Sequence, residues 1–453
     1  MHKKITRALT GLLILAMLTE LTGCGAETVA ALTESAQTLY SGLAVVGSET
    51  ETQSDQGQTE AVTPELSEPE AAPEEQTAEE SPENTGLLGT ISEMLGISES
   101  PTQGELWPEE SSDIYYYYYG QLSDEEKSVY RCLLGNFLAC TESFYVELEG
   151  EQGDYSDRII EIASLVLADH PEIFWVSGSF QWQQWPGGKM LLTPEYTCTG
   201  QALADRQAEL ETAVQQAATE IMAQEPEGLY GMVKAVFQYV IDTVDYDVNA
   251  PDNQNVCSAL LNGSSVCAGY AEETLWLLQR LGFQALTVTG SADGGPHAWN
   301  MVCIDGQWYQ LDTTFGERAF EDEAEETVLT DGMQYDYAYL CCTDRLMDRD
   351  HSPDNPELLP ECTDESLNFF ALSGSLYESS DAATEALTQT LYRGDEGFRA
   401  QFSGAEAYND FLALLQDEQE LLELMGRAGV MSLRICTIPN EMMTAVDIVL
   451  QYG

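Results

Sequence analysis

The chain has 453 residues and a formal net charge of −61, which arises from 78 acidic and 17 basic residues. This length exceeds what one hydrophobic core usually holds and predicts two or three folded units, at roughly 150 residues each. The charge excludes a nucleic-acid-binding protein, because a chain without a basic patch repels phosphate groups. The eleven cysteines form no CxxC pair, so we expect buried thiols rather than a zinc site or a dense disulfide framework.

The first 24 residues have the parts of a secretory signal. Basic residues up to Arg7 precede an apolar run over residues 12–18, and the segment ends in a lipobox at Cys24. The apolar run is shorter than the ~20 residues that a membrane-spanning helix needs. We therefore predict a lipoprotein signal peptide over residues 1–23, lipid attachment at Cys24, and an exported protein anchored to the outer face of the bacterial cytoplasmic membrane.

Residues 24–112 are predicted to be a disordered acidic tether. Between residues 47 and 84 the chain consists mostly of Glu, Ser, Thr, Gln and Pro, a composition that buries too little apolar surface to offset the entropy of ordering. Because no Lys or Arg occurs between Arg7 and Lys127, like charges should keep the tether extended.

An N-terminal α/β region is predicted over residues 113–225. Its tyrosine run at residues 115–119 could stack on a sugar, but nothing beside it converges on such a site, so we interpret it as a packing surface or a strand edge. Ser123 and Glu126 form a capping box that opens the first helix. Apolar spacing then predicts a second helix, a strand and two further helices: residues 158–169, 173–180, 201–224 and 230–244.

The next predicted helix begins at Cys267 and ends at Gly282. At a helix N-terminus, unpaired backbone N–H groups and the positive end of the dipole stabilise an anion, which favours a reactive thiolate. Cys267 is therefore the candidate nucleophile, and its backbone N–H is a candidate oxyanion donor. Asn262 could supply a second donor, but a turn role beside Gly263 is favoured.

Three strands follow this helix, the first two joined by a glycine-rich loop: residues 284–289, 297–304 and 307–313. An Asp-Gly pair joins the last two strands and predicts a two-residue hairpin. The resulting register makes His297 and Asp312 diagonal neighbours on one sheet face, roughly 7–8 Å apart at the backbone, so their side chains can hydrogen-bond. Asn300 points to the opposite face, which favours Asp312 as the group that orients His297.

Histidine is scarce, since the chain has only four and His2 lies in the signal peptide. His170 is predicted in a helix-to-strand turn. His351 falls in an acidic loop over residues 348–356. Only His297 has both a predicted carboxylate partner and a helix-capping cysteine upstream, so it is the candidate general base.

Three segments resemble the motifs of the transglutaminase-like superfamily, in the same order and at similar spacing: residues 266–271, 297–300 and 311–314. The resemblance is strong over residues 229–316 and weaker over residues 335–351. It implies an α+β fold with a papain-like core, in which the cysteine helix packs on an antiparallel sheet. A catalytic domain over residues 226–350 follows from it.

The resemblance also implies roles for individual residues. Cys267, His297 and Asp312 would form a catalytic triad that needs no cofactor and no metal ion. Trp299 and Tyr270 would line the site. The expected reaction is attack on an amide of a protein or peptide, which leaves a thioester that water or an amine resolves. Such an enzyme is a protease, a deamidase or a transglutaminase, and the triad alone does not distinguish them.

Two other readings of the triad region stay open. The domain could be a non-catalytic binding or scaffold module for a cell-surface protein or cell-wall glycan. The three triad residues could also bind zinc, although a hydrogen-bonded histidine–aspartate pair disfavours this.

The C-terminal residues 351–453 are expected to form a small accessory α/β region, with a helix over residues 405–426 and strands over 432–438 and 444–451. Two acidic segments, residues 321–326 and 344–354, lack the spacing of an EF-hand and are interpreted as solvated loops.

Overall fold

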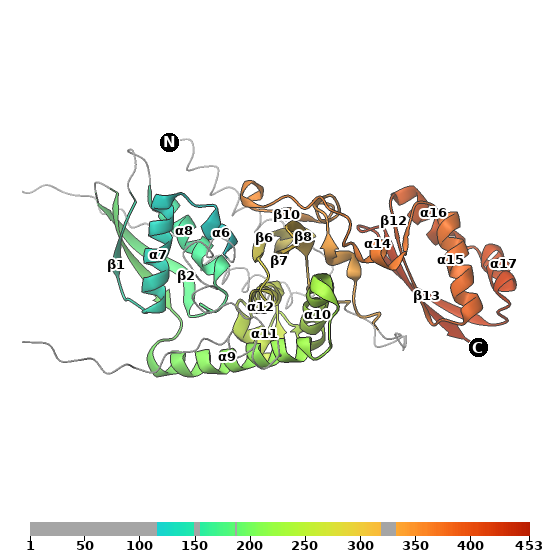
Figure 1. Ribbon diagram of the computed structural model, residues 1–453, viewed down its shortest axis with the longest axis horizontal. Coiled ribbons are helices and arrows are strands. Elements are labelled where there is room, and N and C mark those ends of the chain that lie inside the picture. Colours follow the sequence, from blue (N-terminus) through green and yellow to red (C-terminus); the bar gives the residue numbers. More distant parts are fainter. Residues whose placement is uncertain (1–115, 149–154, 186–187, 319–331) are drawn as a thin grey trace, which may run out of the picture.

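The computed structural model describes residues 116–148, 155–185, 188–318 and 332–453, which form three regions in a row along the longest axis of the molecule (Figure 1). The predicted signal peptide, Cys24, the tether and the acidic segment 321–326 lie outside these residues. In the part of the chain that the structure describes, none of the helices combines the length and apolar character needed to cross a membrane.

The N-terminal region is a three-stranded antiparallel sheet, in the order β1-β3-β2, packed against two helices. Its elements are α6 (Tyr117–Gly120), α7 (Asp124–Leu138), β1 (Phe144–Glu147), α8 (Tyr155–Asp169), β2 (Val176–Trp185) and β3 (Lys189–Tyr196). The predicted capping box is present, because the side chains of Ser123 and Glu126 each bond the other residue's backbone. Tyr117, Tyr118 and Tyr119 are buried. Of the two interpretations of the tyrosine run, a packing surface or a strand edge, the first is therefore confirmed for these three residues.

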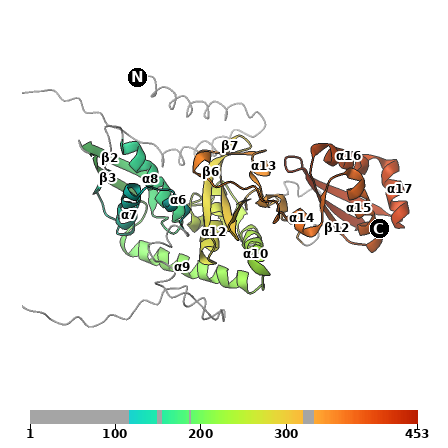
Figure 2. The ribbon, with the colours of Figure 1, turned by 45° about the horizontal axis from the view of Figure 1, so that its top comes forward.

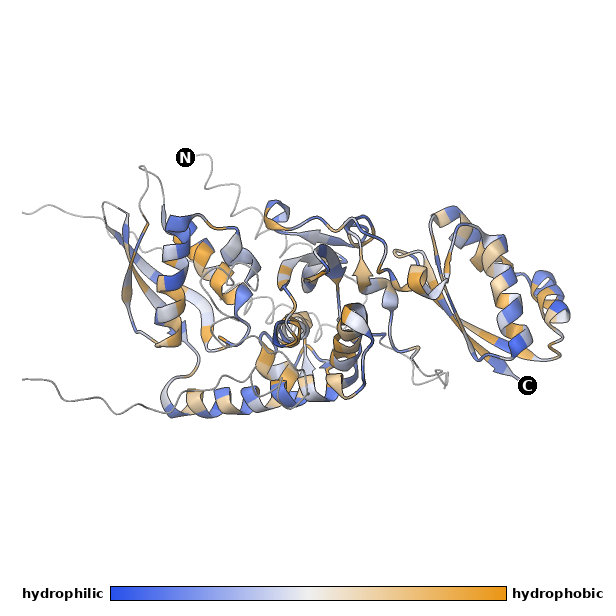
Figure 3. Cartoon of the chain, in the orientation of Figure 1, coloured by the Kyte–Doolittle hydropathy of each residue, from blue (hydrophilic) through white to orange (hydrophobic). Residues whose placement is uncertain are grey.

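A long helix, α9 (Gly200–Met222), connects the first two regions. It runs beneath both of them in Figures 1 and 2. Hydrophilic and hydrophobic residues alternate along it (Figure 3). Leu203 joins the N-terminal core, whereas Leu210, Val214 and Ile221 join the central core. The boundary predicted at residue 226 therefore separates α9 from the region that buries most of its apolar face.

The central region is a five-stranded antiparallel sheet, in the order β10-β6-β7-β8-β9, with α12 packed on one face. This arrangement confirms the predicted α+β class and the packing of the cysteine helix on a sheet. The helices are α10 (Gly228–Thr243), α11 (Val256–Asn262), α12 (Cys267–Arg280) and α13 (Asp344–Met347), with the 3₁₀ turns η1 (Tyr337–Tyr339) and η2 (Pro356–Leu358). The strands of the sheet are β6 (Ala285–Ala292), β7 (Gly295–Ile304), β8 (Gln307–Leu311), β9 (Leu340–Cys342) and β10 (His351–Pro353).

Two tight hairpins fix the register of the central sheet. The β7–β8 turn at Asp305-Gly306 pairs Ile304 with Gln307, as predicted. The β6–β7 turn is equally short, because Asp293 and Gly294 adopt φ values of 49° and 75°, which suit a two-residue hairpin. The prediction of a glycine-rich loop before His297 is therefore wrong, because β6 and β7 both continue as far as this two-residue turn.

The segment that follows Asp312 returns to the sheet twice. β9 pairs with β8 at one edge, and β10 pairs with β6 at the other. The prediction that residues 344–354 form a solvated loop is wrong, because this segment contains α13 and the whole of β10. His351 consequently belongs to the central sheet rather than to the region predicted to begin at residue 351.

The C-terminal region is a second α/β unit, with sheet order β11-β12-β14-β13. Its elements are α14 (Phe369–Ser373), β11 (Leu376–Tyr377), α15 (Ser380–Arg393), β12 (Gly397–Phe402), α16 (Ala405–Gln416), α17 (Glu418–Ala428), β13 (Leu433–Asn440) and β14 (Ala445–Tyr452). The helix predicted over residues 405–426 is divided at Asp417, whose side chain caps α17. Arg318 joins this unit to the central region by bonding Asp447 at 2.6 Å and Asp336 at 3.3 Å.

Candidate active site

Cys267 is the first residue of α12, as predicted, and no side chain caps the helix start at Val266. The first turn also lacks an acidic residue, so the positive end of this helix faces the thiol without a competing carboxylate in that turn. The approach to the helix is fixed by the short parallel pair β4 (Asp245–Tyr246) and β5 (Ser264–Ser265). Gly269 is needed here because a β-carbon would collide with the Ser265 side chain.

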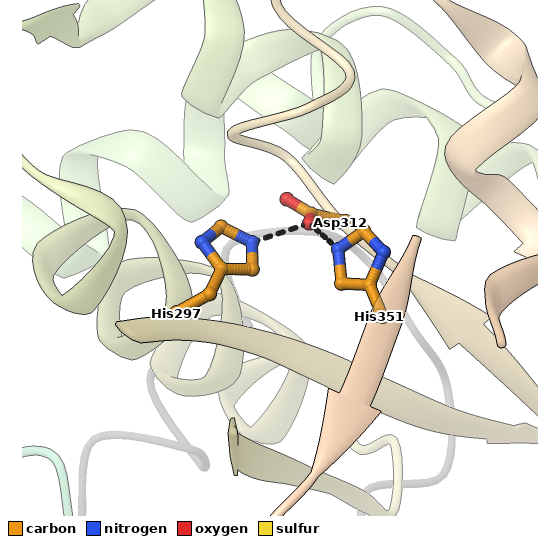
Figure 4. A group of neighbouring side chains, drawn as sticks. All are labelled: His297, Asp312 and His351. Carbon is orange, nitrogen blue, oxygen red and sulfur yellow. Dashed lines mark hydrogen bonds and ion pairs between the residues drawn. The ribbon is translucent and has the colours of Figure 1, made fainter. Parts of the chain in front are cut away.

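His297 lies near the start of β7, and Asp312 follows β8 directly (Figure 4). The predicted hydrogen bond between them is present, with His297 Nε2 2.7 Å from Asp312 Oδ2. The other carboxylate oxygen, Oδ1, accepts the backbone N–H groups of Thr314 at 2.8 Å and Phe315 at 3.0 Å. The loop after β8 therefore fixes the carboxylate, and the carboxylate in turn orients the imidazole.

The charge state of the His297–Asp312 pair follows from its burial and its partners. Burial alone would lower the pKa of His297, but the charge and hydrogen bond of Asp312 and the adjacent Cys267 raise that pKa to about 10. Burial alone would raise the pKa of Asp312, but His297 and His351 hold it below its ordinary value. Since Asp312 occupies Nε2, Nδ1 is the ring nitrogen left for the thiol, and the raised pKa of His297 favours the imidazolium form at neutral pH.

The structure assigns different positions to the two residues expected to line the site. Trp299 stacks on the His297 ring, with centroids 5.9 Å apart and planes 15° apart, so it supports the imidazole from the core. Tyr270 is 0% exposed, and its hydroxyl bonds the Val244 carbonyl and Glu317. It cannot line an open surface, because its ring and its hydroxyl are both committed to the interior.

Tyr246, which the sequence pattern did not single out, is an exposed aromatic residue beside the approach to Cys267. It is 50% exposed and belongs to β4, which pairs with the strand just before Cys267. Burial of part of the ring and the charges of Cys267 and Asp312 raise the pKa of its phenol to about 12. Its hydroxyl therefore stays protonated at neutral pH.

His351 is the second residue of the site that sequence reasoning missed. Its Nε2 lies 2.9 Å from Asp312 Oδ2, the oxygen that His297 also contacts (Figure 4). Its Nδ1 lies 2.6 Å from Asp350 Oδ1. The weak resemblance over residues 335–351 was the available signal, but the acidic surroundings of His351 suggested a solvated loop instead.

His297, Asp312 and His351 are residue types that bind metals, and their nearest ligand atoms all lie within 4.8 Å of one another. Both imidazole Nε2 atoms, however, lie at hydrogen-bond distance from the same carboxylate oxygen. In this arrangement a proton bridges each nitrogen to the oxygen, which leaves neither nitrogen a lone pair for a metal ion. The geometry favours a proton-transfer site.

Comparisons with known proteins match the central region of the chain to one family. Residues 215–313 match the family model described as the transglutaminase-like superfamily. The chain is also similar to kyphoscoliosis peptidase, with 25% identity to the mouse protein and 24% to the human protein over 140 residues. These matches cover 27% of this chain and 21% of each relative, so the chain spans about a fifth of the length of these curated proteins.

A solved structure described as that of a TGase aligns with 41% of this chain and 54% of its own, at 14% identity and a TM-score of 0.24. The family match covers α10, α11, α12 and the strand β7, which carries His297. It ends one residue after Asp312. The central region of this chain is therefore similar to the transglutaminase-like superfamily over residues 215–313.

Proposed function

We propose that this chain is a thiol enzyme that acts on amide bonds of a protein or peptide, with Cys267 as nucleophile, His297 as acid and base, and Asp312 as the orienting carboxylate. One observation carries the proposal. A cysteine at an uncapped helix start neighbours an imidazole whose other nitrogen is 2.7 Å from a buried carboxylate. This arrangement is the general signature of an activated nucleophile.

The first half of the reaction forms a thioester. The Cys267 thiolate attacks the amide carbonyl carbon, and the backbone N–H at the start of α12 stabilises the oxyanion that develops. The carbon–nitrogen bond then breaks while His297 donates its proton to the departing amine or ammonia. Asp312 stabilises the imidazolium before this transfer and keeps the ring in place during it.

The second half resolves the thioester. His297, now neutral, removes a proton from water or from a primary amine as that acceptor attacks the thioester carbon. The thiolate leaves, and His297 again becomes an imidazolium. Water as acceptor gives proteolysis or deamidation, and a lysine amine gives a crosslink. The proposed setting is the bacterial cell surface, on the basis of the lipobox at Cys24.

The proposal is tested by alkylation of the full-length chain with iodoacetamide near pH 6. Cys267 should react at least ten times faster than the other thiols, because a thiolate is the alkylated form. His297→Ala should remove this advantage, and peptide mass spectrometry reads each cysteine separately. Buried Cys257, whose pKa burial raises to about 12, is the internal reference. Equal and slow labelling of all thiols would support the alternative of a non-catalytic binding module.

The acceptor is identified by a second experiment. The full-length chain is incubated with a glutamine-containing peptide, with and without a primary amine, and the product masses are measured. A gain of about one mass unit reports deamidation, a conjugate reports transfer to the amine, and shorter fragments report proteolysis. Cys267→Ala is the control, because it removes the nucleophile and should abolish every product.

A further inference from the structure

The Asp312 carboxylate has four hydrogen-bond partners, and each of them must donate. Two are the backbone N–H groups of Thr314 and Phe315 on Oδ1. The other two are Nε2 of His297 and Nε2 of His351 on Oδ2. Backbone amides are donors only, and a carboxylate with donors on both oxygens is ionised. His351 therefore carries a proton on Nε2.

The other nitrogen of His351 is held in the same way. Nδ1 lies 2.6 Å from Asp350 Oδ1, and the second oxygen of Asp350 accepts the Tyr339 hydroxyl at 2.6 Å. The His351 and Asp350 side chains are only 0% and 1% exposed, so no bulk water replaces either contact. With both ring nitrogens directed at carboxylate oxygens, His351 carries two protons and a full positive charge.

We propose that His351 is a positioning residue of this site, held as a buried imidazolium that fixes Asp312. It extends the pH range over which the Cys267–His297 pair reacts to lower pH. The inference rests on the proposed function. The rings of His297 and His351 are 5.2 Å apart, and Phe315 packs on both, at 4.9 and 4.8 Å. The aromatic cover keeps water from screening the charge.

The sign of the effect follows from charge. A fixed cation favours the deprotonated form of every neighbouring acid, so it stabilises the Cys267 thiolate at lower pH. The remaining ionisable groups around His351 do not replace it. Tyr339 and Cys342 are neutral, since burial raises the pKa of each. The carboxyl group of Asp350 cannot supply a positive charge. Arg349 is directed away, with its side chain bonded to the Met442 carbonyl.

The test is the pH dependence of Cys267 alkylation in His351→Gln. Glutamine can still donate a hydrogen bond to Asp312, but it carries no charge. The acid limb of the rate profile should move to higher pH by about one unit, for a unit charge several ångströms away at an effective dielectric near 20. Alkylation near pH 6 should then be about tenfold slower. A purely structural role would lower the rate at all pH values without moving the limb.

His170→Gln is the matched control, because His170 is also buried and also bonds a carboxylate, Glu172, at 2.7 Å. This variant should keep the wild-type profile. If Cys267 of the wild type has no His297-dependent advantage, the proposed function fails. If it has that advantage and His351→Gln reproduces the wild-type profile, the function stands and the inference is overturned.

A second measurement does not depend on how the variant folds. In wild-type protein labelled with ¹⁵N-histidine, both ring nitrogens of His351 should show the shifts of a protonated imidazolium at pH 8. Assignment is simple because the chain has only four histidines. A neutral tautomer of His351 at that pH would contradict the proposal.

Discussion

Two regions of the molecule contain a buried histidine bonded to a carboxylate at the same distance, through Nε2 of His297 and through Nδ1 of His170. His297 lies 2.7 Å from Asp312 in the central region, and His170 lies 2.7 Å from Glu172 in the N-terminal region. An aromatic ring packs on each imidazole, and the pKa of each imidazole is raised by its carboxylate in spite of burial. On these criteria alone the two pairs cannot be told apart.

Their surroundings differ in what the histidine can act on. The carboxyl groups that act on His170 are those of Glu172 and Asp169. Asp169 accepts the Tyr130 hydroxyl and the backbone N–H groups of Tyr118 and Tyr119, so this cluster ties α6 to α7 and α8. His297 instead has a thiol beside it, at the start of a helix. A buried histidine–carboxylate pair is thus a structural element until a nucleophile and a helix end are added to it.

The largest effect that separates the two regions should come from Asp312→Asn compared with Asp169→Asn. The side chain of asparagine at position 312 has one acceptor oxygen, so it cannot accept hydrogen bonds from both the loop amides and His297. The orientation of His297 is then disrupted, and peptide turnover should fall roughly 10²- to 10⁴-fold. Asp169→Asn should leave turnover within about twofold while it lowers the melting temperature. Turnover is measured by product mass and stability by calorimetry. A similar loss of turnover in both variants would remove the distinction drawn here.

An intermediate effect is expected from Gly290→Ala on β6. A β-carbon there would meet the carbonyl oxygen of Ser352 and, at 2.8 Å, the Cα of Pro353. The clash should push β10 outward, withdraw His351 from Asp312, and move the acid limb of alkylation to higher pH. A loss of about 1–3 kcal/mol in unfolding free energy should accompany the strain.

Gly295→Ala is the control for this variant, because it lies in the same hairpin and its β-carbon would make only an ordinary contact, at 3.8 Å from the Ala292 carbonyl oxygen. It should leave the alkylation profile unchanged. A well-folded Gly290→Ala protein with the wild-type profile would show that close approach of β10 is not required.

The smallest effect is expected from His170→Gln, measured as a pH-dependent change in stability. The pKa of His170 is raised in the folded state, so its contribution is fully present below its unfolded value, about 6.5, and is lost as pH rises through the folded value. The pKa of Glu172 is lowered, so its contribution is lost in acid. The deficit of the variant, about 1 kcal/mol, should be greatest near pH 5–6. A deficit that grows with pH would contradict this sign.

The sequence was informative where neighbouring residues determine the structure. The Asp305-Gly306 turn sets the β7–β8 register, and that register brings His297 and Asp312 together. It also turns Asn300 away, and the Asn300 amide indeed donates to the Ala271 carbonyl on α12. Cys267 was located correctly because helix starts have local signals.

The parts that were missed depend on contacts between distant residues. β10 has three residues and reaches β6 across about 60 positions of sequence, so no turn or periodic pattern indicates the pairing. Tyr270 was misplaced because its burial depends on Glu317 and Val244, which the helix pattern does not contain. The polarity of residues 344–354 was misread as solvation, although Asp350 bonds His351 and Tyr339.

The order of the central sheet has a consequence for its solubility. Both of its edges, β9 and β10, are formed by residues that follow the family match, which ends at residue 313. A fragment trimmed at that residue would leave β6 and β8 as open edges, with rows of unpaired backbone N–H and C=O groups that can pair with other chains. The two short strands thus protect the sheet from edge-to-edge aggregation.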